Sequence, residues 1–151
     1  MKLSVYLSGE IHSNWRETIE AGVAKAGLEV TLTAPNTCHA DSDDCGDRIL
    51  GSEENNFWKD HKASKINGLR TRKLISDADI VVVRFGDKYK QWNAAFDAGY
   101  AAALGKSLIV MHGPEIVHPL KEVDAAAQAV CETPEQVVEI LQYIMTNQLP
   151  A

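Results

Sequence analysis

Short apolar segments alternate with longer amphipathic segments along most of this chain. The apolar segments are rich in branched residues, which is typical of strands whose sheet is covered on both faces. The predicted strands are residues 3–7, 28–32, 80–83, 108–111 and 128–131. The segments between them carry apolar residues three and four positions apart, which predicts helices with one buried face. The predicted helices are about 14–25, 57–76, 93–104, 120–126 and 133–146.

Polar residues and glycines mark where several of these helices begin and end. Asn14, with Glu17 three positions later, resembles a capping box for the first helix. Asn93 is the expected cap of the helix that contains most of the alanines, and Gly105 supplies the left-handed stop at its end. The run Thr133-Pro134-Glu135-Gln136 is a strong helix start, because it combines a cap, a proline at the first position and a glutamine at the third.

Residues 33–56 show no clear periodicity and are predicted to form a long loop. They contain six acidic residues, and a loop of this length in a compact domain is usually functional, mobile or an interface. Phe57 and Trp58 then either open a helix or anchor the loop. That helix is expected to run to about Ser76, with Gly68 as a candidate break.

The alternation of strands and helices predicts a single α/β domain, residues 1–151, built on a parallel sheet with helices on both faces. Five strands in this order favour a flavodoxin-like three-layer sandwich with the strand order 2-1-3-4-5. In that arrangement a ligand binds beyond the carboxyl ends of strands one and three. Residues 8–13, 84–93 and 112–118 would then surround one crevice.

Composition excludes several classes of partner. The formal net charge of −6 argues against nucleic acid, and no apolar run approaches the roughly 20 residues that span a bilayer. The first residues enter a strand and lack a signal-peptide core, so we expect a cytoplasmic protein with no membrane partner. The cysteines form no CxxC motif, which fits reduced thiols. Since the spacing of Cys38, His39 and Cys45 does not suit tetrahedral zinc, we expect no metal and no cofactor.

One acidic side chain is placed where it could do chemistry in the predicted crevice. Asp97 falls in the first or second turn of the helix at 93–104, where the helix dipole and the free backbone N–H groups favour an ionised carboxylate. This carboxylate could bind or attack a ligand. It could also do no more than stabilise the helix, by about 0.3–1 kcal/mol.

Three segments resemble the nucleoside 2-deoxyribosyltransferase family. Tyr6-Leu7-Ser8-Gly9 resembles the end of its first strand, and residues 78–83 resemble its third strand. Residues 95–106, with the run Gly99-Tyr100-Ala101 and the closing pair Gly105-Lys106, resemble its signature helix. The similarity is closest to the small YtoQ branch, and the length and the order of elements agree over the whole chain. The resemblance therefore also implies the flavodoxin-like fold predicted above.

The resemblance implies a role for Asp97, because the acid at the matching position is the family's nucleophile. It attacks the anomeric carbon of a 2-deoxyribonucleoside, and a second base then captures the sugar, as in retaining glycosyl transfer. Asp97 is one methylene shorter than the family's usual glutamate. Gln91 and Trp92 stand where the family has a polar or acidic group, and residues 67–73 contain no counterpart of a further acid on the preceding helix.

Other residues around the crevice are candidates for substrate binding, each with a plainer alternative. His12 could bond a sugar hydroxyl, and Arg84 could bind a phosphate or pair instead with a neighbouring acid. Glu10 is the best second carboxylate for acid–base work, although a lone surface glutamate is the commoner outcome. Tyr89 and Trp92 could stack on a base or insert into the core. The predicted substrate-binding residues are Ser8, Gly9, Glu10, His12, Arg84, Gln91, Trp92 and Asn93.

The sequence therefore supports two hypotheses about function. The first is an enzyme that acts on the N-glycosidic bond of a nucleoside or nucleotide, either as a transferase or as a hydrolase. The second is a binding module for the same ligands that has kept the fold and lost the chemistry. The resemblance also implies a homo-oligomer, with residues 33–56 and the alanine-rich helix as candidate contacts.

Overall fold

Five parallel strands form the central sheet of the computed structural model, which describes residues 1–151. The strands are β1 (Leu3–Gly9), β2 (Val30–Thr33), β3 (Ile80–Arg84), β4 (Ser107–Met111) and β5 (Ala129–Cys131). They lie in the order β2-β1-β3-β4-β5, and every neighbouring pair is parallel. The flavodoxin-like α/β sandwich and its strand order were predicted correctly. From β1 the chain adds β2 on one side and then β3 on the other, and this change of side creates a switch point between β1 and β3.

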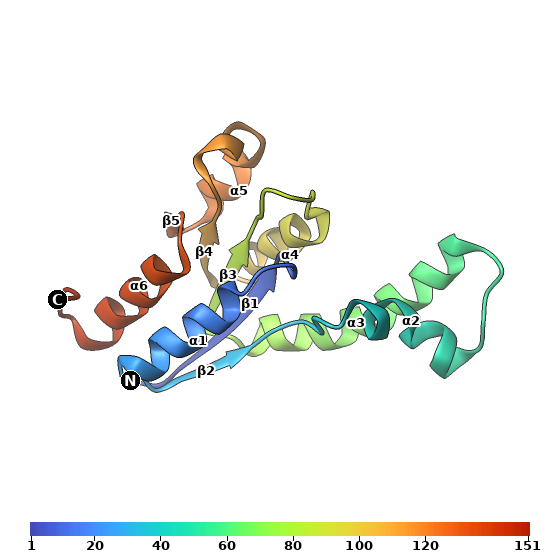
Figure 1. Ribbon diagram of the computed structural model, residues 1–151, viewed down its shortest axis with the longest axis horizontal. Coiled ribbons are helices and arrows are strands. Elements are labelled where there is room, and N and C mark those ends of the chain that lie inside the picture. Colours follow the sequence, from blue (N-terminus) through green and yellow to red (C-terminus); the bar gives the residue numbers. More distant parts are fainter.

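Helices cover both faces of this sheet (Figure 1). They are α1 (Trp15–Lys25), α2 (His39–Leu50), α3 (Asn56–Asp77), α4 (Trp92–Ala103), α5 (Lys121–Ala126) and α6 (Pro134–Thr146). Two 3₁₀ turns, Pro114–Ile116 and His118–Leu120, precede α5. Helices α1 and α6 contact each other on one face, while the carboxyl-terminal part of α3, α4 and α5 lie on the other. No helix combines the length and the apolar composition that crossing a membrane requires.

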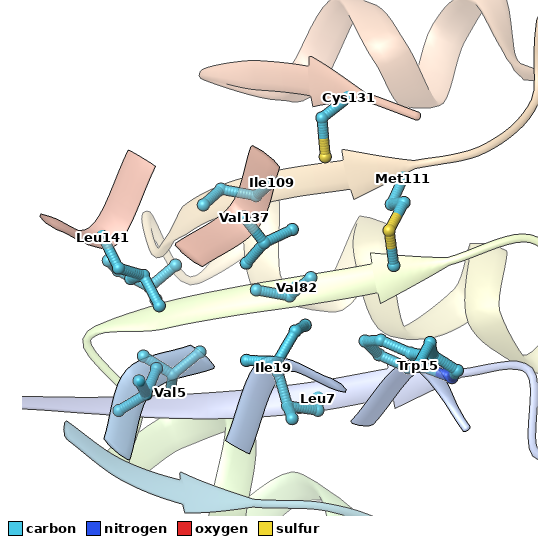
Figure 2. Close-up of a cluster of buried hydrophobic side chains, with 12 residues drawn as sticks. Val5, Leu7, Trp15, Ile19, Val82, Ile109, Met111, Cys131, Val137 and Leu141 are labelled. Atoms are coloured by element: carbon cyan, nitrogen blue, oxygen red, sulfur yellow. The ribbon is translucent and has the colours of Figure 1, made fainter. Parts of the chain in front are cut away.

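Two separate apolar cores follow from the alternation of side chains along the strands. On one face, Val5, Val82 and Ile109 point toward α1 and α6, where they meet Ile19 and Leu141 (Figure 2). Each fully buried aliphatic side chain of this kind stabilises the fold by about 1.5–3 kcal/mol. This core therefore fixes α1 and α6 on the sheet.

The second core lies under α3 and α4 and contains small residues. Ala94, Ala98 and Ala101 form the buried face of α4, and they contact β3 and β4 residues such as Val81 and Val110. Alanine side chains let the helix axis come close to the sheet. The close approach brings the second turn of α4, which carries Asp97, down to the carboxyl end of β1.

The segment at 33–56 was wrongly predicted as a loop, because α2 occupies half of it. Gly46 is the only buried residue of α2, and a Cβ there would lie 2.6 Å from Cβ of Lys62 on α3. Four aspartates, a glycine and a cysteine give α2 a weak intrinsic helix propensity. The helix therefore depends on its contact with α3, which no local pattern reveals.

Three predicted details of the helices also differ from the structure. Helix α3 continues through Gly68 without a break. The Asn14 side chain makes no capping hydrogen bond, and Asn93 lies inside α4, which begins one residue earlier. The capping box of α6 was predicted correctly, since Thr133 Oγ1 accepts from the backbone N–H of Gln136 and the Gln136 side chain accepts in return.

Helix α2 and the first part of α3 form a hairpin, here called the arm (residues 39–67), that extends away from the sheet (Figure 1). Polar contacts hold its two helices together. Lys59 pairs with Asp44 at 2.9 Å, Lys62 pairs with Glu53 at 2.6 Å, and the Asn67 amide donates to the backbone carbonyl of Ser42 at 2.9 Å. The arm therefore differs from the rest of the chain, here called the body, in having almost no apolar core.

Candidate functional site

The carboxyl ends of β1 and β3 lie side by side at the switch point of the sheet. Gly9 is paired with Arg84, and its φ of +107° is a conformation that favours glycine. A Cβ at Gly9 would lie 2.1 Å from the carbonyl oxygen of Arg84, so only glycine lets the two strands approach this closely. The next backbone N–H, that of Glu10, donates to the same oxygen at 3.1 Å. This contact gives the edge a fixed shape.

Asp97 and Ser8 meet at this edge. The Ser8 hydroxyl, which is fully buried, donates to a carboxylate oxygen of Asp97 at 2.6 Å. Burial raises the pKa of Asp97, and the Ser8 hydrogen bond opposes part of that rise. We had expected the helix dipole to favour the ionised acid, but the pKa shifts in the opposite direction because Asp97 is half-buried in the second turn. No cation lies within ion-pair distance of it.

Tyr6 lies on the same face of β1, two positions before Ser8. Its ring is completely buried, and its hydroxyl has no hydrogen-bond partner. Burial is the main reason that the pKa of Tyr6 rises to about 12, and the nearby charge of Asp97 adds to the rise. Thr71 lies near enough to lower this pKa in part, although it does not reach hydrogen-bond geometry. An unsatisfied buried hydroxyl is costly, so the Tyr6 hydroxyl is a polar group that the fold leaves without a partner on this face of β1.

Sequence reasoning did not assign a role to Tyr6, although the signal was available. Residues two apart on a strand point to the same face, so Tyr6 must share a face with Ser8. The alternation of side chains along β1 predicts which face of the sheet Tyr6 lies on, but not which element covers that face. Helix α4 covers it, and its position is fixed only by tertiary contacts.

Glu10 is buried rather than a lone surface glutamate. Its carboxylate accepts hydrogen bonds from the backbone N–H of His12, the hydroxyl of Ser13 and Nε of Arg84, the last at 3.3 Å. Burial alone would raise the pKa of Glu10, but these three donors outweigh it and the pKa is lowered. A carboxylate held ionised in this way suits structural bracing better than proton donation. Of the two alternatives for Arg84, the structure shows the pairing with Glu10.

Arg16 braces the same turn from the α1 side. Its guanidinium donates to the backbone carbonyls of Leu7, Gly9 and Glu10, at 3.1, 3.1 and 2.7 Å. The indole N–H of Trp15 also donates to the Glu10 carbonyl, at 2.8 Å. The turn after β1 is therefore held rigid, which keeps Ser8 in place next to Asp97.

The loop between β3 and α4 lies over this turn. The rings of His12 and Tyr89 have centroids 4.8 Å apart, and the side chain of Gln91 accepts from the backbone N–H of Gly86 at 3.0 Å. Trp92 and Tyr89 are 73% and 54% exposed, so neither inserts into the core. Gln91 therefore shapes the loop, while the side chains of Trp92 and Asn93 face solvent at the start of α4.

His112, at the end of β4, is the third polar group of this edge. It is buried, its Nδ1 lies 2.7 Å from the carbonyl oxygen of Gly113, and its Nε2 lies 3.0 Å from the carboxylate of Asp124 on α5. With both ring nitrogens facing oxygens, His112 ties α5 to the sheet. The segment at 112–118 therefore closes one side of the edge without offering a free imidazole.

Two surface cavities lie beside strands of the sheet. One, of about 360 Å³, is lined by residues of β5, α6 and the carboxyl-terminal tail. The other, of about 250 Å³, lies at the ends of β1 and β2, and Leu7 and Arg16 line part of it. Neither is lined by Asp97 or Ser8. No group of three or more His, Cys, Asp or Glu side chains is arranged to hold a metal ion.

The comparison with protein families decides the relationship. Residues 6–145 match the family described as nucleoside 2-deoxyribosyltransferase YtoQ. The chain belongs to this YtoQ family. It is also 45% identical over 148 residues to the Bacillus subtilis (strain 168) protein described as "Uncharacterized protein YtoQ", covering 98% of this chain and 100% of that one. The resemblance inferred from the sequence is thereby confirmed.

Solved structures with low sequence identity support the fold of this YtoQ-family chain. One is a 2-deoxyribosyltransferase from Bacillus psychrosaccharolyticus, with a TM-score of 0.57 and 18% identity over 89% of this chain and 90% of that one. Another is a conserved protein from Enterococcus faecalis V583, with a TM-score of 0.61 and 14% identity over 95% and 99% of the two chains. At these identities the likeness establishes the architecture alone.

Proposed function

We propose that this YtoQ-family chain cleaves the N-glycosidic bond of a nucleoside or nucleotide, with Asp97 as the nucleophile. The observation that carries the proposal is the environment of that carboxylate. It lies at the carboxyl ends of the strands, half-buried, oriented by Ser8 and unpaired with any cation. A carboxylate that no cation neutralises, in a partly desolvated site, is suited to stabilise a positively charged transition state.

In the proposed reaction, a carboxylate oxygen of Asp97 forms a bond to the anomeric carbon as the carbon–nitrogen bond to the base breaks. The bonding electrons leave with the base, which takes a proton from solvent. A second base or water then attacks the same carbon and gives up a proton, and the ester electrons return to Asp97. Two displacements of this kind retain the sugar configuration. A second base makes the reaction a transfer, and water makes it a hydrolysis.

The other predicted site residues have distinct proposed roles. Ser8 orients the nucleophile, and the exposed rings of Tyr89 and Trp92 are available to stack on a base, at about 1–3 kcal/mol per stacked base. His12 and Asn93 are available to bond sugar hydroxyls, since both side chains are exposed beside this edge. The remaining residues, Gly9, Glu10, Arg84 and Gln91, shape the backbone that surrounds the ligand.

A binding module without chemistry is the second candidate, and two observations favour it. Burial raises the pKa of Asp97, so this carboxyl gives up its proton less readily than an exposed aspartate does. Gln91 stands where the family has a polar or acidic group. Its side-chain oxygen accepts a hydrogen bond from the backbone N–H of Gly86 and is therefore not free for a ligand. Such a chain would bind a nucleoside or nucleotide and leave its glycosidic bond intact.

Incubation with a panel of 2-deoxynucleosides and their 5′-monophosphates, with and without free bases, tests the two candidates. Chromatography should detect released or exchanged base with the unaltered protein, and Asp97→Ala should abolish it. Asp87→Ala is the matched control, because Asp87 is an exposed acid on the neighbouring loop. Turnover that survives Asp97→Ala would show that the nucleophile is wrong. A ligand that raises the melting temperature without turnover would support the binding module.

A further inference from the structure

The edge strand β5 leaves part of its backbone without a partner. It is the last strand of the sheet and pairs only with β4. The backbone N–H of His112 donates to the carbonyl oxygen of Cys131 at 3.0 Å, so the backbone of Cys131 faces β4. Because successive residues of a strand direct their N–H and C=O to opposite sides, those of Val130 face away from the sheet. An open edge of this kind is a template to which another strand can add.

The cavity of about 360 Å³ described above, here called the β5–α6 groove, lies along this open edge (Figure 1). The α6 residues that line it are three, one and three positions apart and therefore share one face of the helix: Gln136, Glu139, Ile140 and Tyr143. Leu149 and Pro150 of the carboxyl-terminal tail line it too, but the tail makes no backbone hydrogen bond to β5. The groove thus has a strand edge on one side and a helix face on the other, which suits an extended peptide that adds to a sheet.

Several apolar side chains of the groove are exposed. Val130, Tyr143 and Leu149 are 48%, 46% and 81% exposed, although all three line the same cavity. Apolar residues scattered singly are ordinary on a protein surface, whereas a group of them in one groove usually marks a contact with another molecule. The occupant of the groove is therefore expected to carry apolar side chains.

Three unpaired acids give the groove a negative charge. Glu132 follows β5 directly, and Glu135 and Glu139 lie four residues apart on α6. All three are exposed, and none forms an ion pair within the chain. A segment with lysine or arginine side chains would neutralise them, and complementary charges favour such a partner over others. A second copy of this chain is disfavoured here, because pairing two β5 edges would bring the same acids together.

We propose that the β5–α6 groove binds an extended segment of a partner protein, with apolar side chains flanked by basic ones, and that this segment adds to the sheet beside β5. Its backbone would pair with the free N–H and C=O of Val130. Alternate side chains of a strand point to the same face, so a central apolar side chain would lie against Ile140 and Tyr143. The basic side chains on either side of it would reach the glutamates of α6. This interaction does not depend on the proposed chemistry, because Asp97 does not line the groove.

Peptide binding tests the charge of the groove. The probe is a dye-labelled peptide, Lys-Val-Val-Val-Lys with both ends blocked, and fluorescence anisotropy should show that the unaltered protein binds it more tightly than Glu-Val-Val-Val-Glu. Glu139→Lys should weaken binding of the lysine peptide by about fivefold, equivalent to about 1 kcal/mol, and should strengthen binding of the glutamate peptide. Asp60→Lys is the matched control, because Asp60 is an exposed acid of the arm and the same change of charge there should alter neither affinity. Equal binding of the two peptides, or an equal effect of the two variants, would overturn the proposal.

Two further changes test whether the peptide adds as a strand. Methylation of the peptide backbone nitrogen, either at the central valine or at both outer valines, blocks one edge of the extended peptide at a time. Only one of these two peptides should lose binding, and loss in both or in neither would contradict strand addition. Val130→Pro removes the N–H that faces away from the sheet, at a position where an edge strand tolerates proline, and should abolish binding. Circular dichroism shows that this variant has folded.

Amide chemical shifts and light scattering identify where the peptide binds and what else could occupy the edge. The lysine peptide should shift the amides of β5, α6 and the carboxyl-terminal tail, whereas shifts confined to the Asp97 edge or to the arm would place it elsewhere and overturn the proposal. Light scattering should give the same mass for the unaltered protein and for Val130→Pro. An assembly that Val130→Pro dissociates would show that a second copy occupies β5, in place of the partner proposed here.

Discussion

The body and the arm of this protein are stabilised in different ways. The body buries two groups of twelve apolar residues, one on each face of the sheet. The arm buries only Gly46 and Ala63 between its helices and relies on ion pairs and a side-chain amide. Apolar burial is cooperative across the whole body, whereas exposed ion pairs contribute little to stability. The body should therefore unfold as one unit, and the arm should open separately at lower cost.

The largest expected effect tests the cooperativity of the body. Leu141→Ala on α6 leaves a cavity in the core shown in Figure 2 and should lower the free energy of unfolding by about 2–5 kcal/mol. For a domain of this size that corresponds to a fall of about 4–20 °C in melting temperature. Leu149→Ala, at an exposed position, should have little effect. If only α6 lost structure in hydrogen exchange, the single-unit description of the body would be wrong.

A second change tests whether the turn after β1, which contains Glu10, unfolds together with the rest of the body. Glu10→Gln removes the charge opposite Arg84 and should cost about 2–4 kcal/mol at neutral pH. Since the folded state lowers the pKa of Glu10, its stabilisation is present above the ordinary value of 4.5 and is lost as the pH falls through the folded value. Urea unfolding at neutral and acidic pH should show the difference between the two proteins shrinking in acid. A difference that does not depend on pH would contradict this role.

A third change should separate the arm from the body. A side chain at Gly46 would collide with Lys62 and with the backbone of Ala63, so Gly46→Val should cost the hairpin about 1–3 kcal/mol. Hydrogen exchange should speed up in α2 and the first half of α3, while the body keeps its protection. Gly68→Ala is the matched control, because a Cβ there meets nothing and alanine favours the helix by about 1 kcal/mol. Equal loss of protection in the body would show that the two regions are one unit.

The smallest expected effect is on the pKa of Asp97 at the candidate site. Ser8→Ala removes the hydrogen bond that stabilises the ionised form of Asp97, so the pKa of Asp97 should rise further. If the protein turns a substrate over, the acidic limb of its pH profile should move to higher pH in Ser8→Ala. Carbon NMR titration of the Asp97 carboxyl gives the same quantity if no substrate is turned over. A limb that moves to lower pH would contradict the assigned hydrogen bond.

The division between body and arm also marks what the sequence could predict. The branched runs around Val82 and Val110 and the capping box at Thr133 are local signals, and they gave the strands, the sheet order and α6 correctly. Helix α2 was missed because its residues have weak helix propensity and its stability comes from α3. The predicted capping bond of Asn14 was wrong for the opposite reason. The sequence motif is present, but hydrogen bonds from Arg16 and Trp15 hold the turn before α1 instead.

The sequence placed Asp97 and Ser8 at the same edge of the sheet, but it did not predict their contacts. The switch-point rule and the family resemblance both led to Asp97 and to the strand end at Ser8. The hydrogen bond between them, the raised pKa and the unpartnered Tyr6 hydroxyl depend on how closely α4 approaches the sheet. Glu10 could not be recognised as buried, because a turn folded back on Arg84 leaves no periodic pattern. Tertiary distance, not residue type, decided each of these points.

The direction of α3 has a consequence for how such proteins can diversify. Residues inserted between β2 and α3 lie at the carboxyl edge of the sheet, because β2 ends there and α3 begins there and runs antiparallel to the strands. Surface insertions cost only a slowly growing loop entropy, so a lineage can lengthen or shorten this hairpin without rebuilding either core. Natural variation in this segment would therefore remodel the surroundings of the edge that carries Asp97 while the apolar layers stay as they are.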